Sequence, residues 1–390
     1  MEDILDLNET ILLLIHEYIA KNIKLYSSPK MKDDIFEGIF EILSITFFRD
    51  DLCDLIYENI DYYFSTVGIP RSIIPTVIYR DVCLEKIEKR IDELKKMDQL
   101  GQNTKEWFEF RWNLLSASSM WKVWGTPATQ NQLIYGKCKP VDDKSQHVNI
   151  NSTFHHGHKY EPLSTMLYEY LFDTEITEWG CIKHKDYEEI GASPDGINTK
   201  KGNPRFGRML EIKNIVNREI TGNPKKEYWI QMQIQMEVWD LDECDFLETR
   251  FKEYESEEEF KKDGSFQKTV NDQMKGIIVC FYHNKKPVYK YAPFGITEEE
   301  YEKWYDECLD ADPTITWVRN IYWRLDQYSC VLVLRNREWV RGVVEDIRDV
   351  WKTILYDRKH GYDHRKPKKR KKKEEKIISI ATEAFNSCKN

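Results

Sequence analysis

The chain has 390 residues, of which 41% are hydrophobic, 13% aromatic and 32% charged, so it has ample apolar surface for a core and exceeds the length that one core usually organises. The apolar run from Ile11 to Ile15 is too short for a signal peptide or a membrane span, so we expect an intracellular protein with no membrane contact. The nine cysteines include no CxxC pair, which argues against a zinc site or an iron–sulfur cluster.

Charge is unevenly distributed along the chain. The net charge is −9, but residues 358–376 contain eleven Lys or Arg and three Asp or Glu, a local +8, so the remainder carries −17. An acidic protein of this kind must concentrate positive charge locally if it holds a polyanion. The run RKPKKRKKKEEK (365–376) predicts that residues 358–390 form a disordered basic tail, which serves nuclear import or DNA contact, or only aids solubility.

The predicted elements begin with a helical segment. In residues 1–98, apolar residues recur three to four positions apart, as in 35–43 and 51–64, which predicts a helical N-terminal domain that packs or docks a partner. Residues 99–357 alternate between helix-like and strand-like patterns, which predicts an α/β domain.

Three later segments of this α/β domain have their own patterns. Residues 255–268 are charged and lack apolar periodicity, which indicates an exposed loop or hairpin. YSCVLVL (328–334) predicts a strand, and residues 337–355 predict an amphipathic helix; we expect both to cover the sheet.

Two short segments carry the clearest chemistry, GASPDG (191–196) and MLEIKN (209–214). In a strand, Glu211 and Lys213 would share one face while the apolar residues between them face the other way. A tight turn before that strand would bring Asp195 beside Glu211, because sixteen residues are enough for a hairpin.

A carboxylate pair with a nearby ammonium suits phosphodiester hydrolysis. Asp195 and Glu211 would bind Mg²⁺, with Mn²⁺ as the alternative ion, and the metal would act as a Lewis acid that also activates water. Lys213 would orient that water or stabilise the developing negative charge. Taken singly, the first segment is better interpreted as an ordinary surface turn and the second as the solvated face of an edge strand. Their order and their sixteen-residue separation favour the catalytic interpretation.

Other polar residues flank this pair. FHHGHKYEP (154–162) precedes a helical stretch and places Glu161 in its first turn, where a third carboxylate could complete the metal site. The histidines in the same segment have no HExxH spacing, so we expect them in a loop or facing DNA. In YWIQMQIQMEVW (228–239), Gln231 could orient the water or Lys213, whereas the alternative is that these glutamines only satisfy backbone groups.

The ordered segments WFEFRWNLLSAS, GHKYEP, GASPDG, LEIKN and YWIQMQ resemble the phage lambda exonuclease and YqaJ-type viral recombinase family over residues 105–239. The resemblance implies a restriction-endonuclease-like PD-(D/E)xK fold, with a mixed central sheet flanked by helices. It implies Mg²⁺ binding by Asp195 and Glu211, with Glu161 as a further acid, Lys213 beside the attacking water and Gln231 as the active-site glutamine. It also implies that Arg111 and Ser118 grip a 5′-terminal phosphate, which suits a guanidinium and a hydroxyl.

The same resemblance implies a 5′-to-3′ exonuclease that acts on double-stranded DNA ends in viral recombination, replication or repair. It implies a partner that anneals single strands and assembly of the enzyme as a trimeric ring. The N-terminal helices and basic tail resemble the longer versions of the enzyme in large DNA viruses of eukaryotes. Such an enzyme would act in the host nucleus or in a cytoplasmic viral factory. The alternatives are an endonuclease or RNA-degrading enzyme like the viral alkaline nucleases, and an inert DNA-binding scaffold. The 5′-to-3′ direction of digestion is inferred only from analogy with proteins of the same fold.

Overall fold

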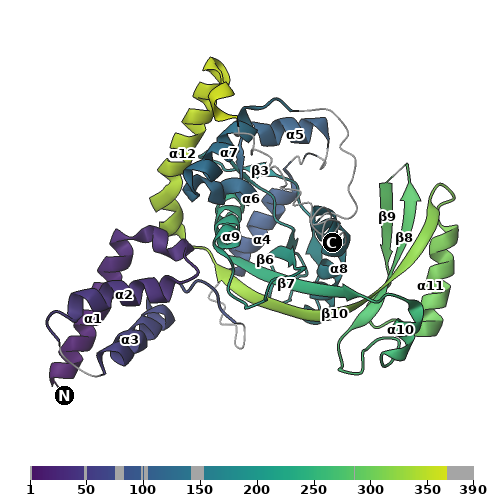
Figure 1. Ribbon diagram of the computed structural model, residues 1–390, viewed down its shortest axis with the longest axis horizontal. Coiled ribbons are helices and arrows are strands. Elements are labelled where there is room, and N and C mark those ends of the chain that lie inside the picture. Colours follow the sequence, from purple (N-terminus) through teal and green to yellow (C-terminus); the bar gives the residue numbers. More distant parts are fainter. Residues whose placement is uncertain are drawn as a thin grey trace, which may run out of the picture.

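The computed structural model describes residues 2–47, 51–74, 83–97, 100, 104–141, 153–284 and 286–366. Figure 1 shows helices at the N-terminal end, a layered α/β core in the middle and a curved lobe at the far side. The mixed sheet with helices on both faces confirms the predicted fold class, including the helical N-terminal region.

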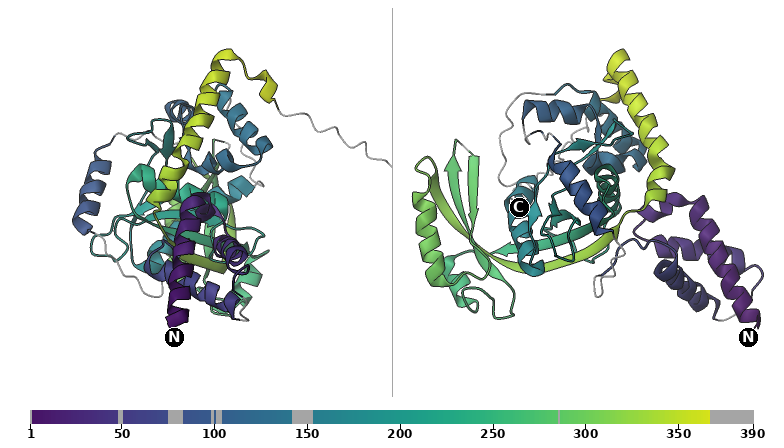
Figure 2. Two further views of the ribbon diagram at one scale, coloured as in Figure 1. Left: turned by 90° about the vertical axis from the view of Figure 1, so that its left-hand side faces the viewer. Right: turned by 180° about the vertical axis from the view of Figure 1, so that it is seen from behind.

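Helices α1 (Glu2–Lys21), α2 (Met31–Leu43) and α3 (Leu52–Thr66) pack against one another as the N-terminal unit. Isoleucines at helical spacing on each helix are buried between them: Ile11 and Ile15 on α1, Ile35 and Ile39 on α2, and Ile56 and Ile60 on α3. The 3-10 turn η1 (Ile23–Ser27) links this unit to the core by packing against the C-terminal helix. The part of the predicted helical segment that contains α1, α2 and α3 therefore forms a helical bundle beside the core (Figure 2).

Helix α4 (Leu84–Lys95) lies on the core rather than in the N-terminal bundle. The Arg90 side chain donates from Nε to the carbonyl of Trp239 at 2.8 Å. A Cβ at Gly207, where φ is +78°, would lie 2.1 Å from a methyl group of Ile87, so this glycine permits both the turn and the close approach of α4.

Within the described residues, the larger sheet has the strand order β2-β5-β6-β7-β10-β8-β9. The strands β6 and β7 are parallel, whereas β5–β6 and β7–β10 are antiparallel. Helix α9 forms the crossover between the two parallel strands, and helix α8 covers the opposite face. The bounds are β2 Ile176–Thr177, β5 Gly196–Asn198, β6 Met209–Asn214, β7 Glu243–Glu253, β8 Lys275–His283, β9 Lys286–Tyr291, β10 Thr316–Leu334, α8 Thr153–Phe172 and α9 Lys226–Trp239.

Strand β10 belongs to two parts of the molecule. Its C-terminal half pairs with β7 in the core, and its N-terminal half pairs with β8 in the curved lobe. The predicted strand 328–334 is therefore itself a strand of the sheet, hydrogen-bonded to β7, and does not cover a face of the sheet as expected. Helices α10 (Glu257–Lys262) and α11 (Glu298–Asp310) back the lobe, where Figure 1 draws them in green.

The prediction of an exposed loop or hairpin at residues 255–268 was wrong at its centre. Ser256 caps α10 by accepting from the Glu259 N–H, and Phe260 inserts into the lobe with 1% of its surface exposed. One buried aromatic residue among charged neighbours leaves no periodicity to detect, so this helix is stabilised by tertiary contact.

The remaining elements assemble around α9 and the C-terminal helix. The predicted amphipathic helix is confirmed as α12, and it packs on α7, α9 and η1 instead of on the sheet. A small sheet, β1-β4-β3, joins the α5–α6 segment to the strand before Asp195. The bounds are α5 Lys105–Trp112, β1 Leu115–Ser116, α6 Ala117–Met120, η2 Trp121–Trp124, α7 Pro127–Cys138, β3 Ile182–Lys183, β4 Ile190–Ala192, α12 Arg337–His360 and η3 Asp363–Arg365.

The predicted basic tail falls mostly outside the described residues, since the description ends at Lys366. Its first residues, 358–360, are the last turn of α12 and not a disordered segment. No described helix combines the length and apolar character that a bilayer span requires.

Candidate functional site

The hairpin of β5 and β6 brings Asp195 to Glu211. Gly196 pairs with Leu210 across the hairpin, and the Asp195 N–H donates to the Leu210 carbonyl at 3.2 Å. The Ile212 N–H donates in turn to Asp195 Oδ2 at 2.7 Å, which fixes the carboxylate against β6. A Cβ at residue 196 would lie 2.2 Å from Ile176, so the turn that carries Asp195 requires glycine beside it.

Strand β6 presents its side chains as the alternating pattern predicts. Leu210 and Ile212 pack against α8, while Glu211 and Lys213 face the α9 side. Glu211 has no exposed surface, and the Lys213 ammonium contacts its Oε1. Burial is the largest single effect and lowers the pKa of Lys213, but the Glu211 and Asp195 carboxylates together more than offset it, so the pKa lies above its ordinary value.

The glutamines of α9 divide into two roles. Gln235 donates from Nε2 to Glu211 Oε2 at 2.7 Å and to the Ser193 carbonyl at 3.0 Å. Gln233 instead donates to the Leu334 carbonyl at 2.9 Å and accepts from the Asn336 N–H, which is the backbone-satisfying role. Gln231, the predicted active-site glutamine, lies one turn before Gln235 on the same face of the helix, so its role stays a prediction.

Helix α8 carries the third acid, Glu161. The predicted position in the first turn was wrong: α8 begins at Thr153 and continues through Pro162, which lacks only the N–H that would bond to the His158 carbonyl. Burial raises the pKa of Glu161, and Glu211 raises it further, against the lowering effect of His158. Glu161 therefore lies within electrostatic reach of the β5–β6 pair.

The histidines before Glu161 are part of the helix and not of a loop. His155 is buried and makes a 2.7 Å hydrogen bond between Nε2 and the Tyr289 hydroxyl, which ties α8 to the lobe. Among the described residues, no three His, Cys, Asp or Glu side chains are grouped closely enough to form a preassembled metal site.

The Asp195 and Glu211 pair nevertheless fits a hard divalent cation. Burial raises the pKa of Asp195 well above its ordinary value, and Glu211 and then Glu161 add to the rise. Three acids that repel one another in a partly buried site need positive charge nearby. Lys213 supplies some of it, because its ammonium lowers the pKa of Asp195. Mg²⁺ is commonly held by one or two carboxylates and several waters, so this donor set suits it.

The family model described as "YqaJ-like viral recombinase domain" matches residues 106–242. This segment is similar to a YqaJ-like viral recombinase domain, and the match covers less than half of the chain. It holds every candidate residue named so far, from Glu161 to Gln235, while the N-terminal bundle, the lobe and α12 lie outside it. The YqaJ-like domain is thus the catalytic candidate of a longer chain.

The chain is also 30% identical, over 377 residues, to the uncharacterized protein R354 of Acanthamoeba polyphaga mimivirus. The alignment covers 85% of this chain and 64% of the viral protein, so the chain spans less than two thirds of its relative. This relative supports the expected origin in a large DNA virus.

Solved structures similar to the chain include the alkaline exonuclease LHK-Exo from Laribacter hongkongensis, alone and in complex with dAMP, and a phage-related exonuclease from Haemophilus somnus 129PT. The LHK-Exo complex is 18% identical with a TM-score of 0.39, and the alignment covers 66% of this chain and 95% of LHK-Exo. The uncomplexed enzyme is 17% identical with a TM-score of 0.38 and the same coverage. The Haemophilus somnus protein is 14% identical, with a TM-score of 0.32, over 62% of this chain and 93% of that one.

The two predicted phosphate ligands of the YqaJ-like domain lie on separate elements. Arg111 is in the last turn of α5, with its guanidinium carbon 4.6 Å from the centre of the Trp107 ring. Ser118 is exposed on α6, and its hydroxyl is 3.4 Å from that of Ser116, whose strand pairs with β4 just before the Asp195 turn. The described residues show no hydrogen bond between Arg111 and Ser118, so a shared role in phosphate binding stays a prediction.

Two groups near Lys213 escaped prediction. Tyr228 places its ring centre 5.1 Å from the Lys213 ammonium and 5.6 Å from the Arg218 guanidinium carbon. Arg218 also forms an ion pair with Glu248, which is buried beside β6. Arg218 stands in the irregular segment between β6 and α9, where the sequence has no periodicity that could place it.

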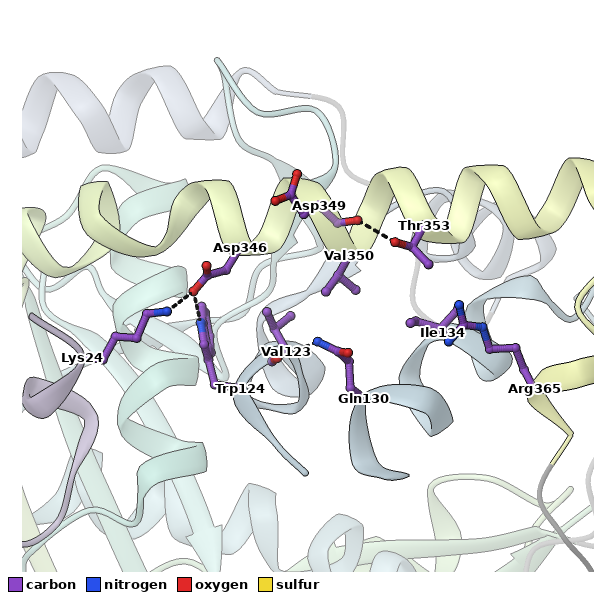
Figure 3. Close-up of a pocket in the computed structure, with 10 residues that line it drawn as sticks. All are labelled: Lys24, Val123, Trp124, Gln130, Ile134, Asp346, Asp349, Val350, Thr353 and Arg365. Carbon is purple, nitrogen blue, oxygen red and sulfur yellow. Dashed lines mark hydrogen bonds and ion pairs between the residues drawn. The ribbon is translucent and has the colours of Figure 1, made fainter. Parts of the chain in front are cut away.

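A separate cavity of about 540 Å³ lies away from these acids, between α12, α7 and the N-terminal unit (Figure 3). Asp346 on its wall accepts from Trp124 Nε1 at 2.7 Å and pairs with Lys24 at 2.6 Å. The charges of Lys24 and Asp346 therefore neutralise each other across the wall of the cavity. We interpret the cavity as a gap where the N-terminal unit packs against the core.

Proposed function

We propose that this chain is a Mg²⁺-dependent deoxyribonuclease that hydrolyses double-stranded DNA from a 5′ end. The observation that carries the proposal is the arrangement of Asp195, Glu211 and Lys213 on one buried hairpin, with Glu161 nearby. The YqaJ-like match over the same residues and the exonucleases among similar solved structures agree with a nuclease.

Each residue has a task in this proposal. Asp195 and Glu211 would hold Mg²⁺, which when bound supplies Lewis acidity and a more acidic water. Lys213 keeps its proton because the Glu211 and Asp195 carboxylates together raise its pKa against the effect of burial. Its ammonium would therefore act as a fixed positive charge that stabilises the anionic transition state. Gln235 holds Glu211 in its orientation, and Glu161 adds a third acid from the middle of α8.

Each round of hydrolysis from a 5′ end leaves a new 5′-phosphate on the shortened strand. Water adds to phosphorus, the bond from phosphorus to the 3′ oxygen breaks, and the 3′ oxygen takes up a proton. The released nucleotide keeps its own phosphate and gains a 3′-hydroxyl, while the shortened strand begins again with a 5′-phosphate. A site that recognises this phosphate through Arg111 and Ser118 would accept its own product as the next substrate.

We extend the proposal to the setting of the enzyme. It would act in viral recombination, replication or repair, with a protein that anneals the exposed 3′ strand, and as a trimer if the chain assembles as a ring. It would work in the host nucleus or a cytoplasmic viral factory, and the basic run, outside the described residues, would direct import or contact DNA.

The decisive experiment uses linear duplex DNA labelled at each 5′ and 3′ end, phosphorylated or not, beside a closed circle. Wild type in Mg²⁺ should release nucleotides from phosphorylated 5′ ends, and Glu211→Gln should lower this rate at least about a hundredfold, as removal of a transition-state contact does. Glu188→Gln, an exposed acid in the same domain, is the matched control and should behave as wild type.

The other outcomes identify the alternatives. Cleavage of the circle would identify an endonuclease, and preferential loss of an RNA substrate would identify an RNA-degrading enzyme. DNA binding without any cleavage that depends on Glu211 would leave a scaffold and refute the proposal.

A further inference from the structure

Three cationic side chains meet where α5, α7 and α12 converge: Arg111, Lys137 and Arg358. Figures 1 and 2 show that the C-terminal end of α12 reaches the side of the core where α5 and α7 lie. Within the described ranges, no carboxylate forms an ion pair with any of the three. Each of them is only partly exposed, so solvent does not fully screen their mutual repulsion.

Backbone carbonyls at the end of α5 hold two of these cations in place. Lys137 donates from Nζ to the Arg111 carbonyl at 2.6 Å. Arg358 donates from Nη2 to the Trp112 carbonyl at 2.7 Å and to the Lys137 carbonyl at 2.8 Å. Its guanidinium carbon also lies 3.4 Å from the centre of the Trp112 ring.

These contacts supply what the end of a helix lacks. The last carbonyls of α5 have no partner within the helix, and cations are favoured at that end of the helix dipole. Trp112 is held on its other side as well, because its indole N–H donates to the Lys139 carbonyl at 2.6 Å. The last turn of α5, which carries Arg111, is thereby tied to both α7 and α12.

Holding Arg111, Lys137 and Arg358 close together costs electrostatic energy, because three positive charges repel one another. A bound anion would offset this cost. Burial, together with the smaller effects of the neighbouring Arg111 and Arg358, lowers the pKa of Lys137 to about 8. Burial also raises the pKa of the adjacent Cys181 thiol against the opposing influence of Arg111, so the thiol does not provide a negative charge. A phosphate at Arg111 would relieve the repulsion.

We propose that Lys137 and Arg358 are positioning residues that hold the last turn of α5 so that Arg111 meets a terminal phosphate. Helix α12, which lies outside the YqaJ-like domain, would thereby set how strongly the enzyme prefers phosphorylated ends. This inference rests on the proposed nuclease function. It adds a role for two residues that do not themselves touch the DNA.

The test compares initial rates on duplexes that differ only in a 5′-phosphate or a 5′-hydroxyl, at low substrate, as a ratio of kcat/KM values. Arg358→Gln and Lys137→Met should each lower the ratio by about tenfold, since small misplacements of a positioning group have effects of this size or larger. Arg358→Lys should recover part of the ratio, because it keeps a cation with fewer donors. Arg341→Gln, an exposed arginine on the same helix, should leave the ratio unchanged.

A ratio is the appropriate readout because a loss of folded protein lowers both rates equally. Circular dichroism and the binding of phosphorylated against unphosphorylated duplex, measured without Mg²⁺ by fluorescence anisotropy, separate folding from recognition. An unchanged ratio in Arg358→Gln and Lys137→Met would overturn the inference, as would a wild type that cleaves both ends equally. A wild type that cleaves nothing refutes the proposed function, and the binding measurement then still tests the positioning role.

Discussion

Gln235 offers the sharpest test of the site geometry, because its amide joins the two segments that carry the acids. Replacing it with Met keeps the size of the side chain but removes the donors to Glu211 Oε2 and to the Ser193 carbonyl, at 2.7 and 3.0 Å. A hydrogen bond to a charged group contributes about 1.5–3 kcal/mol. If about 2 kcal/mol of this is needed to hold Glu211 for catalysis, kcat should fall about 30-fold.

Gln233→Met is the matched control for this variant. Gln233 is on the same helix, is equally buried and also loses two hydrogen bonds in the variant. Its partners are Leu334 at the end of β10 and Asn336, the N-cap of α12. Both variants should lose a similar free energy of unfolding, about 2–3 kcal/mol for two buried bonds, as measured in urea.

The assay measures kcat on phosphorylated duplex ends at saturating DNA and Mg²⁺, corrected for the folded fraction. Calorimetric binding of Mn²⁺ gives a second readout, which should weaken in Gln235→Met and not in Gln233→Met. Equal kcat values per folded molecule in the two variants would show that Gln235 only stabilises the fold, and would refute the reasoning.

Three further predictions concern the metal, the core and pH. With 10 mM Mg²⁺ and a site of about 1 mM affinity, the free energy of unfolding should rise by about 1.4 kcal/mol, and Glu211→Gln should abolish that rise in thermal unfolding with and without chelator. Arg208→Leu removes the guanidinium that contacts the buried carboxylates of Glu243 and Asp245 at 2.9 and 3.0 Å, while Asp245 keeps its ion pair with Arg205. Loss of one partner from these buried ion pairs should cost about 3–5 kcal/mol in urea unfolding. The folded pKa of Lys137 is about 8 against 10.5 for an ordinary lysine, so the unfolded chain binds more protons between these values and stability should rise with pH across that window, a rise that Lys137→Met removes.

Each of these three has an outcome that would contradict it. Equal Mg²⁺ stabilisation of Glu211→Gln would place the ion elsewhere. A cost below about 1 kcal/mol for Arg208→Leu would mean that the two acids find other partners or become protonated. Identical pH profiles for wild type and Lys137→Met would mean that Lys137 is solvated and titrates as an ordinary lysine.

The parts of the site that the sequence predicts are those governed by local periodicity. The alternation in residues 209–214 predicts the strand and the shared face of Glu211 and Lys213, and the turn at Asp195 follows from its proline and glycine neighbours. The structure confirms the strand and the hairpin.

The parts that escape prediction depend on how elements pack. Helical periodicity places Gln231 and Gln235 on one face, but only the axial position of α9 against β6 decides which amide reaches Glu211. The start of α8 at Thr153, across Pro162, and the helix α10 around Phe260 are likewise maintained by contacts that a local pattern does not contain. Arg358 lies 247 positions from Arg111 in the chain, so no local signal links it to α5.

Strand β10 joins the lobe to the part of the sheet that carries Glu211. Its 19 residues form a continuous ladder with only short irregularities, one of them between Leu325 and Gln327, where Asp326 pairs with Arg250 and Lys252 of β7. We expect amide hydrogen exchange to be slow on both sides of this point and faster at it, because the extra residue interrupts the ladder. A displacement of the lobe would then bend β10 at Asp326. Because β7 pairs with both β10 and β6, the displacement would be transmitted through β7 to β6.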